Sequence, residues 1–403
     1  MPNKERNIPK RRFKEFENAD AWELRKLGEV AEIVMGQSPD SKNYTDNPLD
    51  NILVQGNADL RDGCVVPRVW TTQVTKTAEK GDLILSVRAP VGDVGRTNYN
   101  VVLGRGVAGI KGNEFIYHLL VKMKLFGYWT KLSTGSTFES INSDDIKNSI
   151  ILFPSHPEQE AIGTFFSTLD RHITLHQRKL DKLKSVKQAY LSEMFPAEGE
   201  RVPKRRFPGF TDAWELRPLG EIGNTYTGLS GKTKDDFGHG DGRFVTYMNV
   251  FSNPISLPEM VEAVEIDESQ NTVRYGDVLF TTSSETPEEV GMSSVWLENT
   301  ENTYLNSFCF GFRPVKKVNP YYLAYLLRSS GMRRKISFLA QGISRYNISK
   351  TKMMELEISI PNEKEQSAIG SFFSTLDQHI TLHQRKLEKL KNLKKALLNE
   401  LFV

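Results

Sequence analysis

The chain has only two cysteines, Cys64 and Cys309, among its 403 residues. Two cysteines cannot build a disulfide framework, which excludes a small disulfide-stabilised secreted fold and favours a reducing, cytoplasmic location. No run of about 18 apolar residues occurs, so no membrane-spanning helix is expected. The N-terminus MPNKERNIPKRRF is basic, but no apolar stretch follows it, and a signal peptide is not expected.

The sequence also lacks a credible active site. It contains no Walker phosphate loop, no HExxH and no CxxC. Residues Asn319-Pro320-Tyr321-Tyr322 resemble the Asn-Pro-Pro-Tyr motif of amino-methyltransferases, but the second proline is missing. Asn319 and Pro320 also suit the N-cap and first position of a helix, and we favour this interpretation. The chain is therefore expected to be non-catalytic by itself.

An excess of charge of one sign is lacking as well, because 53 basic residues face 50 acidic ones and the net charge is +3. This balance permits nucleic-acid binding through local basic patches but does not require it. At this length, the chain can form two or more domains, each with its own core.

The dominant positive feature is a repeat. Residues 158–183 and 365–390 are identical at 22 of 26 positions, and a repeat governs the interpretation of everything around it. A second repeat relates the segment that starts with Pro9-Lys10-Arg11-Arg12-Phe13 to the one that starts with Pro203-Lys204-Arg205-Arg206-Phe207. The second copy of this segment follows the first long repeat, whereas the first copy stands at the N-terminus. The repeat is thus arranged circularly, and the N-terminal segment supplies what the second long repeat lacks.

The two regions between the repeats share a plan but little sequence. Apolar runs at 51–54, 82–87 and 150–153 predict strands in the first, and the spacing over 114–132 predicts a helix. The second region has a matching strand at 276–280, a helix from Pro320 to about Ile336 and a strand at 358–360. We expect an α+β protein with two pseudo-symmetric mixed α/β domains, separated by a pair of long antiparallel coiled-coil helices.

The long repeats carry the apolar spacing of a coiled coil over about five heptads. In the first copy the seam runs from Ile162 to Met194, with His176 and Lys187 in two of its places; in the second it runs from Ile369 to Leu401, with His383 and Lys394 in the gaps. His176 and His383 are predicted to form a polar layer that fixes the register of the two helices.

Two alternatives concern the polar residues of these helices. The spacing of His172 with His176, and of His379 with His383, is that of two metal ligands on one helix face, but we favour the register interpretation and expect no metal. The second half of each helix is basic, and this face could be solvated, contact the DNA backbone or dock an acidic partner.

The whole pattern resembles the specificity subunit of type I restriction-modification enzymes. The resemblance rests on the paired PEQEAIGTFFSTLDRHITLHQRKLDKLK and KEQSAIGSFFSTLDQHITLHQRKLEKLK stretches, together with the RRF…AWELRKLGE and RRF…AWELRPLGE segments, and covers essentially the whole chain. It implies the following order: an N-terminal segment completing the repeat (1–21), target recognition domain 1 (22–155), a central long helix (156–196), a linker (197–213), target recognition domain 2 (214–362) and a C-terminal long helix (363–403).

The resemblance implies a DNA-binding subunit of a bacterial defence system. Each recognition domain would bind one half of a bipartite double-stranded target, while the helices would fix the spacer. Two modification subunits would methylate adenine N6, and two ATP-dependent restriction subunits would translocate and cleave DNA. No cofactor is expected on this chain, since S-adenosylmethionine, ATP and Mg²⁺ belong to the partners. The alternative is a non-enzymatic coiled-coil adaptor that presents two protein-binding heads.

Base-contacting residues should present polar side chains from loops. Family likeness and polarity favour the glycine-rich loop after the first strand and the loop before the last strand, although a solvated surface role is the competing interpretation for each residue. In domain 1 the candidates are Gln37, Ser38, Lys42, Thr134, Ser136, Thr137 and Phe138. In domain 2 they are Ser230, Lys232, Lys234, Gln341, Ser344, Arg345, Tyr346 and Asn347. Three further arginines could bind phosphate or guanine: Arg88, Arg96 and Arg105.

Overall fold

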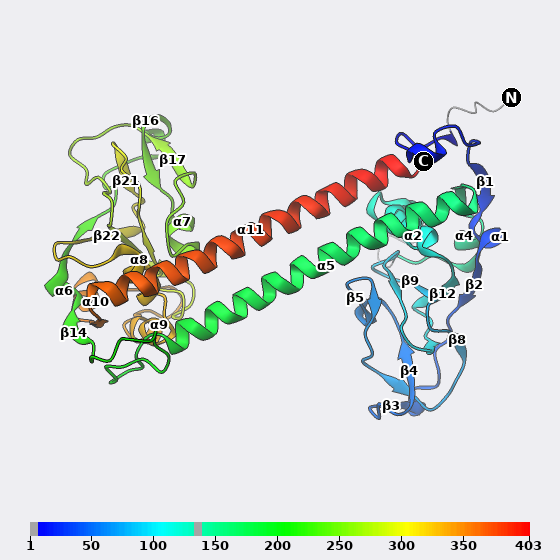
Figure 1. Ribbon diagram of the computed structural model, residues 1–403, viewed down its shortest axis with the longest axis horizontal. Coiled ribbons are helices and arrows are strands. Elements are labelled where there is room, and N and C mark those ends of the chain that lie inside the picture. The colour runs from blue at the N-terminus through cyan, green and yellow to red at the C-terminus, as the bar shows by residue number, and fades with distance from the viewer. Residues whose placement is uncertain (1–6, 133–138) are drawn as a thin grey trace. The chain divides into compact units, whose positions relative to one another are not determined.

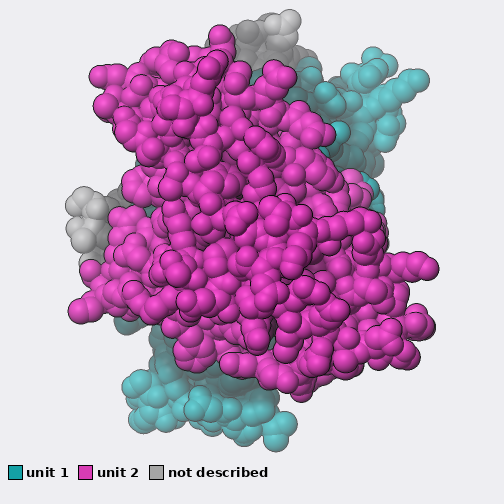
Figure 2. Space-filling model, turned by 90° about the vertical axis from the view of Figure 1, so that its left-hand side faces the viewer, with its two compact units in different colours: residues 1–177, 385–403 teal, residues 178–384 magenta. Residues whose placement is uncertain are grey.

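The computed structural model describes residues 7–132 and 139–403, and the chain divides into two compact units. Unit 1 comprises residues 1–177 with 385–403, and unit 2 comprises residues 178–384 (Figure 2). Their border falls inside both long helices, because α5 spans His156–Glu193 and α11 spans Glu363–Leu401. Each unit therefore contains a globular part, one end of α5 and the opposite end of α11. Among the described residues, no helix is long and apolar enough to cross a membrane.

The globular part of unit 1 is built on two main sheets (Figure 1). In the first the order is β2 (Glu32–Met35), β12 (Val107–Lys111), β9 (Leu83–Ser86), β10 (Val94–Arg96), β6 (Cys64–Val65) and β5 (Leu60–Arg61). In the second it is β3 (Tyr44–Thr45), β7 (Trp70–Thr71), β4 (Asn51–Val54), β11 (Val101–Leu103) and β8 (Lys76–Ala78). Strand β9 is buried along its whole length, as its unbroken apolar run requires.

Short helices and a two-stranded ribbon close unit 1. The ribbon joins β1 (Glu23–Lys26) to β13 (Ile150–Phe153). The remaining helices are α1 (Leu27–Val30), α2 (Glu114–Leu125), α3 (Tyr128–Leu132) and α4 (Ser143–Lys147). Within the described residues of unit 1, short 3-10 turns occur at Lys14–Phe16, Ser41–Asn43 and Asn57–Asp59. Helix α2 buries Phe115 and Leu120 in a core that also takes Phe166 of α5 and Phe402 after α11.

Unit 2 repeats this plan with different strands. The ribbon pairs β14 (Glu215–Pro218) with β24 (Glu357–Ile360). One sheet has the order β15 (Gly223–Thr227), β22 (Cys309–Pro314), β18 (Val278–Thr281) and β20 (Ser293–Val295); the other has β17 (Val261–Val264), β16 (Phe237–Val245) and β21 (Thr303–Leu305). Strand β19 (Ser283–Ser284) pairs with β23 (Tyr346–Asn347). The helices are α6 (Leu219–Ile222), α7 (Tyr247–Ser252), α8 (Pro320–Leu326), α9 (Ser330–Phe338) and α10 (Lys350–Met354), with a 3-10 turn at Lys234–Asp236.

The structure confirms the predicted strands and divides two predicted helices. The helix expected over 114–132 ends at Leu125 and restarts at Tyr128, with Gly127 at φ 72° in the left-handed region between the two parts. The helix expected from Pro320 is interrupted after Leu326, and the Ser329 hydroxyl accepts a hydrogen bond from Met332 N where α9 begins. Asn319 caps α8 through a bond from Tyr322 N, which is the N-cap interpretation of the Asn-Pro pair.

The segments that carry the shorter repeat make the same contacts in both units. In unit 1, Arg12 forms a buried bidentate pair with Glu158 at the start of α5, at 2.7 Å for each bond. In unit 2, Arg206 does the same with Glu365 at the start of α11, at 2.6 and 2.7 Å. These hydrogen bonds raise the pKa of both guanidinium groups. The N-terminal segment thus belongs to the unit that holds the last turns of α11.

Candidate nucleic-acid interface

The loop after β2 is fixed in place by a close backbone approach. A Cβ on Gly36 would lie 2.1 Å from Gly104 O, so only glycine fits there. Gly36 N donates to Val107 O and Gln37 N to Leu103 O, at 3.0 and 2.8 Å. These bonds hold the loop against the turn between β11 and β12, and Ser38 Oγ accepts from Arg105 N in that turn at 3.2 Å.

A third loop completes a polar surface cavity in unit 1. Val87 N, just after β9, donates to Gly106 O at 2.9 Å and brings the following residue, Arg88, to the same place. The cavity has a volume of about 300 Å³. Its polar lining consists of Ser38, Tyr44, Gln55, Asn57, Arg88 and Arg105. Three of the predicted residues therefore lie together, and the exposed Arg88 and Arg105 carry guanidinium forks suited to phosphate or guanine.

Sequence reasoning missed three residues of this cavity. Tyr44 lies in β3, and Gln55 and Asn57 follow β4 directly, where the chain reads Gln-Gly-Asn. Side-chain amides can bond adenine at two atoms, so Gln55 and Asn57 extend the donor and acceptor set of the arginines. The signal in the sequence was a polar turn at the end of a strand.

The other predicted residues of unit 1 are placed differently. Gln37 and Lys42 are exposed outside the cavity lining, and Lys42 Nζ lies 3.2 Å from the Asp40 carboxylate. Arg96 on β10 interacts with other residues outside the cavity: its guanidinium lies 2.6 Å from the Glu114 carboxylate and over the Tyr117 ring at 4.2 Å. Its role in DNA binding stays a prediction that this position does not favour. Four predicted residues lie outside the described part of the chain: Thr134, Ser136, Thr137 and Phe138.

Unit 2 brings the corresponding loops together by the same bonds. A Cβ on Gly228 would lie 2.2 Å from Asn306 O, and Leu229 N donates to Leu305 O at 2.8 Å. After β18, Thr282 donates through both its backbone N and its Oγ1 to Phe308 O, at 3.0 and 2.7 Å. The surface differs chemically, because the position after Thr282 is Ser283 whereas Arg88 follows Val87 in unit 1.

The loop before the last strand of unit 2 forms a small hairpin beside Ser283. Gln341 and Asn347 exchange backbone hydrogen bonds of 2.9 and 2.8 Å, which leaves residues 342–346 as the turn. Arg345 lies across β19, with Nη2 3.1 Å from Ser283 Oγ, and Tyr346 is half-buried against the core. Ile343 at the tip is 96% exposed. The hairpin therefore presents its exposed side chains to solvent: Gln341, Ser344, Arg345 and Asn347.

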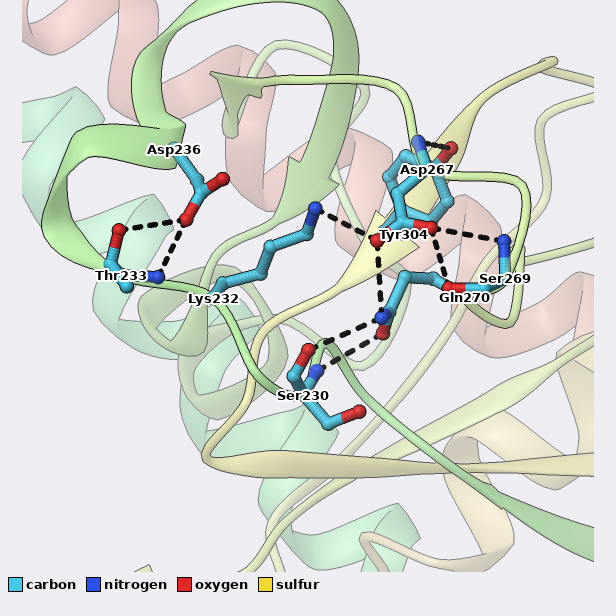
Figure 3. A network of polar contacts seen from close by, with 8 residues as sticks. All are labelled: Ser230, Lys232, Thr233, Asp236, Asp267, Ser269, Gln270 and Tyr304. Atoms are coloured by element: carbon cyan, nitrogen blue, oxygen red, sulfur yellow. Dashed lines mark hydrogen bonds and ion pairs between the residues drawn. The ribbon is translucent and has the colours of Figure 1, made fainter.

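The lysines of the first loop of unit 2 divide into two kinds. Lys232 is bound in a local network, where its Nζ lies 2.9 Å from the Asp267 carboxylate (Figure 3). Ser230 joins this network through Gln270, which accepts from Ser230 N at 3.0 Å. Hydrogen bonds from Ser269 and Lys232 hold the pKa of the Asp267 carboxyl well below its usual value. Lys234 is exposed on its 3-10 turn and presents its charge to solvent.

The histidines and lysines of the helix seam are divided between the two units. His176 lies in unit 1 and His383 in unit 2, both half-buried, and their role in register stays a prediction. The two seam lysines each form an ion pair inside one unit, which the sequence did not indicate. Lys394 lies 2.6 Å from Asp170 in unit 1, and Lys187 lies 2.5 Å from Asp377 in unit 2. Over the described residues, no group of three or more potential metal ligands occurs.

Comparison with known proteins identifies relatives along the whole chain. The family model of the type I restriction modification DNA specificity domain matches twice, over residues 19–185 and 211–392. The type I restriction enzyme MjaIX specificity subunit of Methanocaldococcus jannaschii is 21% identical over 94% of this chain and 92% of its own length. Another protein of that archaeon, named provisionally as the MjaX specificity subunit, is 30% identical over 42% of each chain.

Solved structures show the same fold. The crystal structure of a type I restriction-modification S subunit from M. genitalium has a TM-score of 0.62 at 15% identity, covering 98% of this chain and 99% of its own. A structure from work on complex assembly and conformational transition of a type I system has a TM-score of 0.54 at 19% identity, covering 94% and 97%. At these identities the similarity concerns the fold alone.

Proposed function

This chain belongs to the family of type I restriction-modification DNA specificity subunits, and we propose from this premise how it selects its target. Each unit binds one half of a bipartite DNA sequence through three loops. In unit 1 these loops follow β2, follow β9 and join β11 to β12; in unit 2 they follow β15, follow β18 and join β21 to β22. Unit 1 uses the cavity around Arg88 and Arg105. Unit 2 uses the hairpin of Arg345 and Tyr346 with the exposed polar residues beside it.

The observation that carries this proposal is the contrast between framework and surface. Backbone bonds from Gln37 to Leu103 and from Leu229 to Leu305 hold equivalent loops in equivalent places. The side chains displayed there differ, with two arginines in unit 1 and serine, tyrosine and one arginine in unit 2. A common framework with different donors and acceptors is what two unlike half-sites require, since base edges are distinguished by their hydrogen-bonding groups.

The long helices are proposed to act as the spacer between the two recognition elements. Their seams would form an antiparallel coiled coil of a circularly arranged repeat, and their length would fix the number of unspecified base pairs. The ion pairs of Lys187 with Asp377 and of Lys394 with Asp170 support a defined register, because each joins α5 to α11 within one unit. The recognition domains would correspond to residues 22–155 and 214–362.

Chemistry is proposed to reside on partner subunits. Two modification subunits would carry S-adenosylmethionine and methylate adenine, and two restriction subunits would use ATP and Mg²⁺. The complex would act in the cytoplasm on double-stranded DNA. A coiled-coil adaptor for two protein partners is the less favoured alternative, since it gives no reason for guanidinium and amide groups to converge on one cavity.

The proposal is tested by substitutions that address one unit at a time. Arg345→Ala and Tyr346→Ala should weaken discrimination only in the half-site bound by unit 2, by about 1–3 kcal/mol for each side chain that hydrogen-bonds a base edge. The matched change Arg88→Ala with Arg105→Ala should affect only the other half-site. Binding to oligonucleotides with single changes in each half, in the complex with the modification subunits, measures both effects.

The controls lie in the same loops. Lys42→Ala changes an exposed charge outside the cavity and should weaken binding equally across sequences, because a lysine that contacts phosphate carries no base preference. Equal losses at both half-sites for Arg345→Ala, or no loss at all, would make the assignment of unit 2 wrong.

A further inference from the structure

Two of the loops proposed to bind DNA in unit 2 carry large apolar side chains that the fold leaves in solvent. Phe308, in the turn between β21 and β22, is 56% exposed, and Ile343, at the tip of the hairpin, is 96% exposed. Hydrophobic stabilisation depends on the apolar area removed from water, so an exposed side chain contributes little of it to folding. The core of unit 2 therefore does not explain why these two positions are apolar.

Hydrogen bonds hold the turn and the hairpin at the same place. Thr282, directly after β18, donates through its N and its Oγ1 to Phe308 O, at 3.0 and 2.7 Å. The carbonyl of Thr282 accepts from Ile348 N, just after the hairpin, at 3.0 Å. The next residue, Ser283, has its Oγ 3.1 Å from Arg345 Nη2 in the hairpin itself. Both loops are thus attached to two consecutive residues after β18.

The equivalent position in unit 1 has no side chain. Val87 N donates to Gly106 O as Thr282 N donates to Phe308 O, so Gly106 and Phe308 occupy corresponding places. A Cβ on Gly106 would lie 2.1 Å from Gln55 O, so only glycine fits there. Unit 1 therefore has an arginine-lined cavity beside this position, whereas unit 2 has a phenylalanine ring open to solvent.

The chemistry of DNA indicates what these side chains can bind. Neither phenylalanine nor isoleucine has a side-chain donor or acceptor, so neither can form a hydrogen bond with a base edge. The C5-methyl group of thymine is the apolar group that base pairs present in the major groove, where the other groups are donors and acceptors. Ser344 and Arg345 follow Ile343 directly and could bind the polar groups of the same base pairs.

We propose that Phe308 and Ile343 contact thymine methyl groups in the half-site bound by unit 2, and that this half-site therefore contains A·T base pairs. This inference rests on the proposed DNA-binding function and adds the kind of base that unit 2 selects. Contact with the side chain would remove the methyl group from water. Burial of one such group corresponds to about a fourfold gain in affinity.

Uracil isolates the contribution of the methyl group, because it has the same hydrogen-bonding edge as thymine. The probes are duplexes with the target sequence of this chain, in which uracil replaces the thymines one at a time. Binding is measured for the complex of the chain with its modification subunits. At least one replacement in the half-site of unit 2 should weaken binding about fourfold. Phe308→Ser combined with Ile343→Ser should bind thymine and uracil equally, whereas Phe308→Leu should retain the preference for thymine.

The matched control is Tyr275→Ser, which removes a side chain of similar exposure, 51%, from the opposite end of β18. It should leave the preference for thymine unchanged. The thermal unfolding midpoint should stay the same in all these variants, because the substituted side chains are largely exposed.

The outcomes separate this inference from the proposed function. If every uracil duplex binds as tightly as thymine while other base changes in the half-site of unit 2 still weaken binding, only the inference is wrong. If no base change there weakens binding, both are wrong. If the Phe308→Ser and Ile343→Ser chain keeps the preference for thymine but assembles less well with the modification subunits, these side chains contact a protein and the inference is overturned.

Discussion

His118 is buried completely in α2, and its two ring nitrogens have no hydrogen-bond partner in the described structure. Burial foremost, then the positive charges of Lys394 and Arg96, lowers the pKa of His118 to about 2, although Glu114 and Asp170 lie 3.9 Å away. His118 packs against the ring of Phe166 in α5. In unit 2, Tyr325 stacks on the corresponding Phe373 of α11, and its OH donates to Asp377 at 2.9 Å.

We expect this histidine to make the stability of unit 1 sensitive to acid. The folded state keeps His118 neutral, whereas the unfolded chain protonates it near pH 6.5, so stability is present above that pH and is lost as the pH falls below it. When the pH falls from 7.5 to 5.5, the free energy of unfolding of the unchanged chain should decrease by about 1.4 kcal/mol more than that of His118→Tyr. Urea denaturation at the two pH values measures the difference.

A tyrosine placed on the surface serves as the control for His118. Thr164→Tyr alters an exposed residue of α5 and should leave the pH dependence of stability unchanged, because neither side chain titrates between about pH 5.5 and 7.5. If the unchanged chain and His118→Tyr lose the same free energy of unfolding on acidification, His118 is protonated in the folded state and its buried neutral form is wrong.

At the scale of elements, the pairing of α5 with α11 depends on polar residues inside an apolar seam. Lys187 and Asp377 are each about a quarter exposed or less, and Asp377 also accepts from Tyr325. A double-mutant cycle with Lys187→Met and Asp377→Asn should give a coupling energy of about 1 kcal/mol, because the pair is only partly shielded from water. Chemical denaturation of the four chains supplies the measurement.

The control for this cycle uses the pair at the other unit. Lys394→Met combined with Asp377→Asn joins residues of different pairs, and their effects on stability should add without coupling. A coupling energy near zero for Lys187 with Asp377 would mean that the ion pair does not define the register of the helices.

The sequence predicted most elements but not how their ends converge. Apolar runs such as the one in β9 and the long heptad pattern have a period that identifies them directly. The helix breaks at Gly127, where the backbone takes the left-handed conformation. The apolar pattern continues through this break, so the spacing of apolar residues did not predict it. The grouping of Ser38 with Arg88 and Arg105 arises from backbone bonds between loops far apart in sequence, which no local pattern records.

The same limit of local sequence patterns explains why the ion pairs of the helix seam were not predicted. The heptads located Lys187 and Lys394 at core positions, where an unpaired charge is costly, but the acidic partners lie on the other helix. Asp170 and Asp377 belong to the repeated stretch and give no separate signal of their own. The role of His176 and His383 in the register stays a prediction, and the two lysine ion pairs are additional polar contacts of the seam.

At the scale of the whole molecule, unit 1 draws its parts from both ends of the chain, whereas unit 2 is one continuous segment. Unit 1 needs the N-terminal Arg12 segment, the first half of α5 and the last turns of α11. Glu158→Ala removes one member of a buried ion pair and should cost about 3–5 kcal/mol of unit 1 stability, since the guanidinium would be left without its counter-charge. Glu365→Ala is the matched change and should destabilise unit 2, as limited proteolysis of each chain would reveal.

The proposed spacer role makes a prediction about length. Seven residues added to a helix lengthen it by roughly 10 Å, which corresponds to about three base pairs of B-DNA. One extra heptad inserted after Gln177 and another after Gln384 leave the Lys187–Asp377 and Lys394–Asp170 pairs intact within their units. Mapping methylated adenines in a host that carries this chain should then give the same two half-sites with a spacer about three base pairs longer. A heptad added to α5 alone mismatches the seam and should abolish methylation, while an unchanged spacer after the double insertion would mean that the helices do not set it.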